Sequence, residues 1–401
     1  MTDFLIGRQQ ILDSHLNTFA YEILFRGKDF DLSLKDGAAN ATNQVITDTI
    51  LEIGLNELVG PHKAFINFTT QNILDKTPLL LPKDRIVVEV LESVAVDAEI
   101  IRNLKELSEL GYTIALDDFV LAPEWLPLLE FADIIKLDIM AGSLDDTRQL
   151  IEKLKPYKLR LLAEKVETHE QFQTLCEWGC ELFQGFFFSK PNVVEGKRLG
   201  VSQSAAIQLL SVINKPDIGF AEVGKIVSQD VGLSFKLLHY LNSAFFGLPQ
   251  KIESIQHAIA CLGLIEIKRW INILTLSSLS DKPPSVLQNL LIRAKMCELL
   301  AHEMKEDREN YFLIGMLSGI DGLLDMPLTK VVEQLPLAEE INDAILNYRG
   351  NAGEALKFCI AYERWEPGLT TYRDIAPERI ANIYLESIDW WATEIVPILG
   401  I

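Results

Sequence analysis

Polar and charged side chains recur at the ends of short apolar runs through the first half of the chain, and their types suit chemistry on a phosphate ester. The candidates are Glu22, Asn67, Glu89, Asp117, Asp118, Lys136, Glu164 and Gln184. Most of them carry carboxylate or amide oxygens, which are the ligands that Mg²⁺ and Mn²⁺ prefer. No histidine or cysteine accompanies them, so the set does not favour zinc.

Such a set could hydrolyse a phosphodiester. Two hard cations can hold the ester and activate a water molecule. Glu164 could take the proton from that water, while Lys136 could hold the water or stabilise charge on phosphorus. Taken singly, each residue is more simply a solvated strand end, so the prediction depends on the whole set.

The elements between these residues predict a barrel. Strands are expected at 64–68, 85–91, 112–116, 133–137, 159–163 and 182–188, and helices at 38–58, 97–110, 144–154 and 168–179. Apolar strands that alternate with helices indicate a parallel sheet covered on both faces. Residues 4–12 and 18–26 predict a hairpin-like start. The fold class is therefore α/β with a TIM-like barrel, whose site lies at the C-terminal strand ends.

The second half of the chain follows a different pattern. Residues 189–203 carry Pro191 and Gly196 and end the strand rhythm, so a domain joint is expected there. From residue 203 onward the apolar spacing is helical, which predicts an all-α domain. We expect two domains, 1–195 and 196–401.

Composition excludes several classes of protein. The chain has 401 residues and a formal net charge of −20, without a run of Lys or Arg. Direct binding to nucleic acid or to an anionic membrane is therefore not expected. No apolar run is long enough to span a bilayer, and the first residues lack the features of a signal peptide. With five scattered cysteines, the protein is expected in the reducing cytoplasm.

The run Glu22-Ile23-Leu24-Phe25-Arg26 resembles the Glu-Ala-Leu-x-Arg signature of EAL domains, a family of cyclic di-GMP phosphodiesterases, and the resemblance extends over about residues 1–195. It implies catalytic roles for Lys136 and Glu164, with Mg²⁺ or Mn²⁺ as cofactor if the domain is active. The implied metal ligands are Glu22, Asn67, Glu89, Asp117 and Asp118. Arg26 would contact a ligand phosphate, and Gln184 would close the site.

The departures from the family pattern predict weak or absent hydrolysis. Ile23 replaces the signature alanine, and the Gly-rich loop after the paired aspartates is replaced by a run without glycine that starts at Val120. Lys165 stands where the family has glycine after the general base. If that position needs a positive φ, a lysine costs about 1 kcal/mol or more. The added cation would also help to neutralise the acids, which leaves open that no ion binds.

Residues 228–247 resemble the core of HDOD domains, which are related to HD phosphohydrolases but lack their metal-binding residues, and the likeness covers about 200–390. Leu317-Ser318 stands where a hydrolase would carry its His-Asp pair. The resemblance implies a bacterial regulatory protein that works through protein contacts of the HDOD domain, with cyclic di-GMP as a candidate ligand. An active phosphodiesterase and a scaffold that binds no nucleotide remain open as alternatives.

Overall fold

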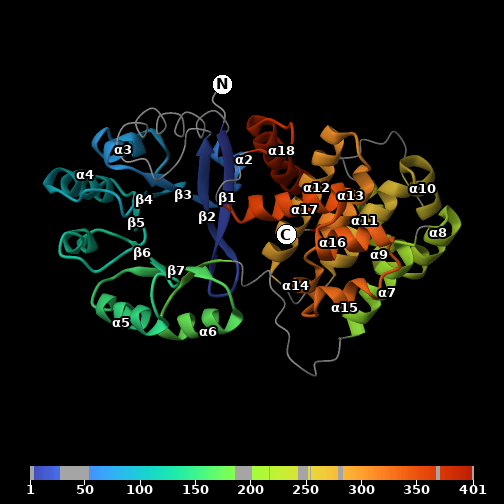
Figure 1. Ribbon diagram of the computed structural model, residues 1–401, viewed down its shortest axis with the longest axis horizontal. Coiled ribbons are helices and arrows are strands. Elements are labelled where there is room, and N and C mark those ends of the chain that lie inside the picture. Colours follow the sequence, from blue (N-terminus) through green and yellow to red (C-terminus); the bar gives the residue numbers. More distant parts are fainter. Residues whose placement is uncertain are drawn as a thin grey trace. The chain divides into compact units, whose positions relative to one another are not determined.

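The computed structural model describes residues 4–27, 54–185, 201–215, 217–242, 252, 254–278, 283–366 and 371–399. The chain forms two compact units (Figure 1). The first comprises Met1–Phe188 together with Ala361–Leu385, and the second comprises Ser189–Ile360 together with Glu386–Ile401. The predicted boundary at residue 195 falls outside the described ranges and stays a prediction.

The first unit contains a closed eight-stranded barrel whose strands follow one another in chain order. The strands are β1 (Phe4–Asp13), β2 (Thr18–Gly27), β3 (Lys63–Phe68), β4 (Ile86–Val90), β5 (Thr113–Leu116), β6 (Ile134–Asp138), β7 (Arg160–Val166) and β8 (Leu182–Gly185). β1 runs antiparallel to β2 and β8, and the other neighbours are parallel. The predicted barrel and its hairpin-like start are confirmed.

Short helices connect the strands. They are α2 (Leu55–Val59), α3 (Thr70–Leu74), η1 (Thr77–Leu80), α4 (Ala98–Glu109), η2 (Leu126–Glu130), α5 (Leu144–Leu154) and α6 (His169–Trp178). α4, α5 and α6 start at Asp97, Ser143 and Thr168, whose side chains accept hydrogen bonds from the first-turn N–H groups. Most of the predicted helix 38–58 lies outside the described residues. The sequence pattern missed α3, which starts at a capping box on Thr69.

A ring of apolar side chains, one from each strand, fills the barrel interior. Its members are Ile11, Ala20, Phe65, Val87, Ala115, Ile134, Leu162 and Leu182. Side chains along a strand alternate between its two faces, so positions two residues apart share a face. In β2 to β8, moving two residues toward the C-terminal rim reaches Glu22, Asn67, Glu89, Asp117, Lys136, Glu164 and Gln184. The candidate residues therefore form the next layer of the interior.

Residues 361–385 complete the first unit by packing on β1. The Tyr362 hydroxyl donates a hydrogen bond to the Ile6 carbonyl oxygen at 2.5 Å. A Cβ on Gly7 would lie 2.5 Å from ring carbons of Trp365, so only glycine permits this contact. The Tyr362 ring lies 5.1 Å from that of Tyr384, and burial raises the pKa of Tyr384 to about 12. These aromatic contacts hold the start of β1.

The remaining elements are helices. They are α7 (Val201–Ile213), α8 (Phe220–Gln229), α9 (Val231–Leu241), α10 (Ile255–Leu262), α11 (Leu264–Ser277), α12 (Pro284–Met304), α13 (Arg308–Leu317), α14 (Ile320–Leu324), α15 (Leu328–Val332), α16 (Glu339–Asn347), α17 (Gly350–Glu363), α18 (Pro377–Trp390), the π-helical turn η4 (Trp391–Ile395) and α19 (Val396–Leu399). Within the described ranges beyond residue 201, the only β-type pairing is one isolated bridge, Tyr372 to Ile375. The predicted all-α second half is confirmed. None of the helices described is both long and apolar enough to cross a membrane.

A buried carboxylate ties three helix segments of the second unit together. Glu298 on α12 has a side chain only 2% exposed, and it forms ion pairs with Arg269 at 3.1 Å and Lys295 at 3.1 Å. Arg308, at the start of α13, contacts the same carboxylate at 2.9 Å. Burial alone would raise the pKa of Glu298, but the three cations outweigh it and lower that pKa below its ordinary value. The ionised carboxylate is thus favoured by the folded unit.

Candidate functional site

Lys136 occupies the centre of the polar layer. Its side chain is 1% exposed, and its ammonium group lies 2.8 Å from Asp117 Oδ1 and 2.9 Å from Glu164 Oε1. The ammonium group also donates to Glu89 Oε1. Glu22 Oε2 is farther away, at 3.7 Å. The barrel therefore brings four predicted carboxylates, from four different strand ends, around a single buried cation.

The protonation of these groups reflects both burial and mutual repulsion. Burial acts to lower the pKa of Lys136, but the surrounding carboxylates, Glu164 first, raise it well above its ordinary value. Burial raises the pKa of Glu89 well above its usual range despite the attraction of Lys136. Burial likewise raises the pKa of Glu164 to about 7, with Asp117 and Glu22 adding to the shift. One ammonium group does not neutralise four carboxylates. An additional cation would therefore stabilise the group of acids around Lys136.

Gln184 fixes the position of Glu22. Its side-chain amide donates to Glu22 Oε2 at 2.6 Å and to Gln9 Oε1 at 2.7 Å. Gln9 lies two residues before the interior residue Ile11 on the antiparallel strand β1, so it belongs to the same layer. The sequence did not single out Gln9, although this spacing on the hairpin is the signal that could have found it.

A bulge in β7 separates Glu164 from Lys165. Ala163 pairs with Phe183, whereas Val166 pairs with Gly185, so β7 carries one more residue than β8 across this step. Lys165 lies within this bulge and has a left-handed backbone conformation, with φ +57°. The close approach of the strands also requires Gly185, because a Cβ there would lie 2.1 Å from the Val166 carbonyl oxygen. The condition under which a lysine at this position carries a backbone cost, a positive φ, is therefore met at Lys165.

Lys165 does not join the ring of acids around Lys136. Its ammonium group forms an ion pair with Asp138 Oδ2 at 2.6 Å, and its side chain is 58% exposed. The sequence predicted Lys165 as an added cation that neutralises the site acids directly. Register explains the difference, because Asp138 is the neighbour of Glu164 across β6 and β7. The charge still matters nearby, since Lys165 acts to lower the pKa of Asp118, which burial and Asp117 raise overall.

The oxygen atoms available at this rim fit a hard divalent cation. Asn67 Oδ1 and Glu89 Oε2 are buried atoms with no hydrogen-bond partner among the described residues. Carboxylate oxygens of Glu92, Asp117 and Asp118 lie within 4.8 Å of one another. Buried oxygens normally have partners, and an all-oxygen donor set suits Mg²⁺ or Mn²⁺. The residues present therefore fit such an ion.

The loop after Asp118 is short and held by its own contacts. Ala122 N–H donates to the Val120 carbonyl oxygen at 2.8 Å, and Trp125 N–H donates to the Ala122 carbonyl oxygen at 3.0 Å. The rings of Phe119 and Trp125 meet edge to face with centroids 6.2 Å apart. Asp118 itself has φ +41°. The turn that replaces the expected Gly-rich loop is thus compact.

Two further residues that the sequence singled out, Ile23 and Arg26, lie in β2. Arg26 lies in β2, but its side chain falls outside the described residues. Ile23 is 2% exposed and packs in the core. It faces away from the interior layer that contains Glu22, so its larger side chain does not enter the polar ring.

Comparisons with known proteins match both halves of the chain. The family model for the EAL domain matches residues 38–191, and the family model for the HDOD domain matches residues 200–333.

Two curated relatives extend over nearly the whole chain. "Cyclic di-GMP phosphodiesterase CdgJ" of Vibrio cholerae serotype O1 is 35% identical over 365 residues, which cover 90% of this chain and 84% of that protein. "Uncharacterized protein YuxH" of Bacillus subtilis is 34% identical over 398 residues, covering 96% and 97%. Among solved structures, "PaMucR Phosphodiesterase, c-di-GMP complex" is 22% identical, with a TM-score of 0.40 over 46% of this chain and 94% of that chain.

Proposed function

We propose, from the premise that this chain belongs to the EAL–HDOD family of proteins linked to cyclic di-GMP signalling, that its barrel is a regulatory cyclic di-GMP site with weak or absent hydrolysis. The observation that carries the proposal is the combination at β7. Glu164 and the ring of oxygens are retained, whereas the next residue is an ion-paired lysine at positive φ. The site keeps the groups for binding while its rim is altered.

Each retained residue has a role that its surroundings support. We assign the metal ligands to Glu22, Asn67, Glu89, Asp117 and Asp118. Bound Mg²⁺ or Mn²⁺ would polarise the phosphodiester and lower the pKa of a water molecule. Glu164, with a pKa of about 7, is suited to accept a proton at neutral pH. Lys136 holds the acids together and supplies positive charge, Gln184 positions Glu22, and Arg26 is assigned to a ligand phosphate.

A contact surface beside the site supports action through protein partners. Val120 is 66% exposed and Leu121 is 38% exposed on the turn after β5, and Met140 is 58% exposed after β6. β5 and β6, which these two turns follow, are neighbours in the barrel, and an exposed apolar patch formed by adjacent turns would favour a protein interface. We assign the regulatory output to protein contacts, made by this rim and by the HDOD half.

The alternative function is a working phosphodiesterase that linearises cyclic di-GMP. The complete set of oxygens and the buried Lys136 favour it, and CdgJ, the relative with 35% identity, is named as such an enzyme. The altered rim at Lys165 and Val120 favours the regulatory function.

Turnover measurements with the full chain separate the two functions. With saturating Mg²⁺ or Mn²⁺, we expect cyclic di-GMP to bind in calorimetry and to be hydrolysed well below 1 s⁻¹, roughly the lower end of ordinary enzymes. Turnover near that value which Glu164→Ala abolishes would establish the phosphodiesterase instead. Absence of nucleotide binding with and without metal would refute both functions.

Replacement of Lys165 by glycine should raise the affinity for Mg²⁺ about fivefold, which corresponds to roughly 1 kcal/mol of charge repulsion near the surface. The variant removes a cation that lies close to Asp118 and frees Asp138. Isothermal titration with Mg²⁺ measures the change, and Lys153→Gly, on the exposed face of α5, is the matched control. Equal Mg²⁺ affinity in both variants and the wild type would mean that Lys165 has no influence on the site.

A further inference from the structure

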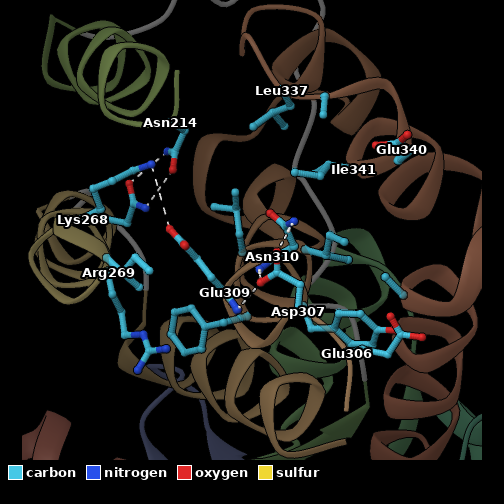
Figure 2. A pocket seen from close by; sticks show the side chains of 18 of the residues that line it. Asn214, Lys268, Arg269, Glu306, Asp307, Glu309, Asn310, Leu337, Glu340 and Ile341 are labelled. Carbon is cyan, nitrogen blue, oxygen red and sulfur yellow. Dashed lines mark hydrogen bonds and ion pairs between the residues drawn. The ribbon is translucent and has the colours of Figure 1, made fainter. Parts of the chain in front are cut away.

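The second unit contains a cavity of about 470 Å³, far in sequence from the barrel residues (Figure 2). It is bounded by α11 and by the first turns of α13, α16 and α17. Its volume falls within the range of small-molecule sites, which is about 300–1,000 Å³. Its lining carries both signs of charge around an apolar section.

One side of the cavity offers hydrogen-bond donors. Asn214 donates to the Leu210 carbonyl oxygen at 2.9 Å and to Asn272 Oδ1 at 3.0 Å, while Asn272 donates in return to Asn214 Oδ1 at 3.1 Å. The Leu210 oxygen fixes the orientation of both amides, because only a nitrogen can face it. Asn272 is 4% exposed, and its second amide hydrogen has no partner among the described residues.

Lys268 lies beside this pair of amides. Its ammonium group is 4.0 Å from Glu309 Oε1, which is too long for a hydrogen bond, and its side chain is 17% exposed. Figure 2 shows Lys268 next to Asn214. The other cation of the lining, Arg269, is already engaged by Glu298 at 3.1 Å and by Glu266 at 3.4 Å. Lys268 is thus the cation available to a ligand.

Carboxylates line other parts of the wall. Asp307 caps α13 through the N–H groups of Glu309 and Asn310, and Glu306 accepts from Asn351 at 2.8 Å. Glu340, in the first turn of α16, has no hydrogen bond or ion pair among the described residues, and Figure 2 shows it across the cavity from Lys268. Glu340 and the loosely paired Glu309 can therefore receive a cation.

The chemistry of the lining selects one class of ligand. Leu337, Ile341 and Ile265 supply apolar surface between the charged groups. A nucleotide would meet four carboxylates, and a simple cation would leave Lys268 and Asn272 unused. We propose that the cavity binds a small zwitterion with an apolar body, an α-amino acid, whose carboxylate contacts Lys268 and Asn272. Its ammonium group, which sits on the same carbon as the carboxylate, then faces Glu309, whose Oε1 lies 4.0 Å from the Lys268 ammonium.

Calorimetry with the full chain tests the assignment. Each common L-amino acid is titrated at millimolar concentration, and the tightest apolar ligand is compared with its analogues that lack the amino or the carboxyl group. We expect saturable binding of at least one apolar amino acid and about tenfold or greater weakening for each analogue. No binding by any apolar amino acid, or equal binding of an analogue, would overturn the proposal.

Two variants test the residues themselves. Lys268→Met and Glu309→Gln should each weaken binding of that amino acid about tenfold or more. Lys330→Met on α15, which does not line the cavity, should leave binding unchanged. Circular dichroism confirms that each variant is folded before titration. Wild-type affinity in both Lys268→Met and Glu309→Gln would show that the ligand binds elsewhere and would refute the site.

Discussion

Lys136→Met is expected to lower the free energy of unfolding by about 3–5 kcal/mol, the effect of removing one partner from a buried ion pair. The variant leaves Glu89, Asp117 and Glu164 facing one another inside the barrel without the ammonium that now contacts all three. Methionine preserves most of the volume of the lysine stem, so the loss measures charge and not packing. Urea unfolding of the full chain in the absence of divalent metal gives the value.

Metal should rescue this variant selectively. A divalent cation that binds the folded ring and not the unfolded chain adds stability by mass action. We therefore expect Mg²⁺ to restore more stability to Lys136→Met than to the wild type. Lys153→Met, on the exposed side of α5, is the matched control and should unfold like the wild type. If Lys136→Met matched the control within about 0.5 kcal/mol, the ring would carry little charge in the folded protein.

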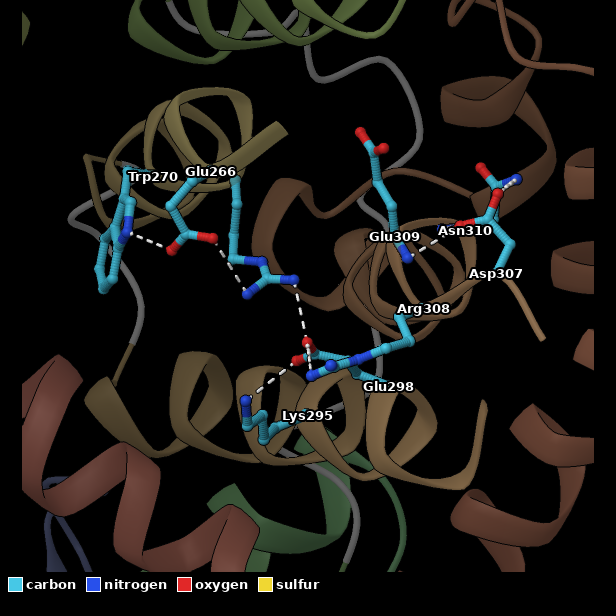
Figure 3. Close-up of polar contacts among 9 residues, drawn as sticks. Glu266, Trp270, Lys295, Glu298, Asp307, Arg308, Glu309 and Asn310 are labelled. Carbon is cyan, nitrogen blue, oxygen red and sulfur yellow. Dashed lines mark hydrogen bonds and ion pairs between the residues drawn. The ribbon is translucent and has the colours of Figure 1, made fainter. Parts of the chain in front are cut away.

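Glu298→Gln is expected to destabilise the second unit by about 2–4 kcal/mol near neutral pH. The amide keeps the shape of the side chain but removes the negative charge that Arg269 and Lys295, each with a side chain 16% exposed, now share. Arg269 then keeps its longer ion pair with Glu266, at 3.4 Å. Figure 3 shows Lys295 and Arg308 converging on the Glu298 carboxylate. Glu333→Gln, at the exposed end of α15, should leave the stability unchanged.

The effect should depend on pH in a defined direction. The pKa of Glu298 is lower in the folded protein than its ordinary value of 4.5, so the unfolded chain binds the proton more tightly. The stability that the carboxylate contributes is complete above that ordinary value and declines as the pH falls below it. The difference in unfolding free energy between wild type and Glu298→Gln should therefore be largest near neutral pH and smaller near pH 4. A constant difference across this range would mean that charge is not the cause.

The strand order and the interior polar layer could be predicted from local pattern alone. An apolar run that stops at Glu89 or Lys136 shows both the strand and the side of the barrel that the polar residue occupies, since the period of two residues is fixed by the backbone. The strands and the polar layer depend on neighbours in the sequence. The question of a positive φ at Lys165 came instead from the resemblance to EAL domains, which have glycine at this position.

Partners set by tertiary packing could not be predicted in this way. Lys165 pairs with Asp138 because of the register between β6 and β7, and register is not visible in either strand alone. The cavity beside Lys268 depends on four helices that are distant in sequence. The apolar spacing of residues 377–394 predicts a helix. The contact between Trp365 and Gly7, which joins residues 361–385 to β1, depends on how the two surfaces fit together and leaves no pattern in the sequence.

That contact has a consequence for how the protein is made. β1 is synthesised before the other strands of the barrel, whereas Tyr362 and Trp365, which pack on Ile6 and Gly7, are synthesised more than a hundred residues after β8. At a translation rate of about 5–20 residues per second, these aromatic residues are synthesised roughly ten to forty seconds after β8. Until residues 361–385 are synthesised, β1 can pair with β2 and β8 but lacks the aromatic side chains that pack on Ile6 and Gly7.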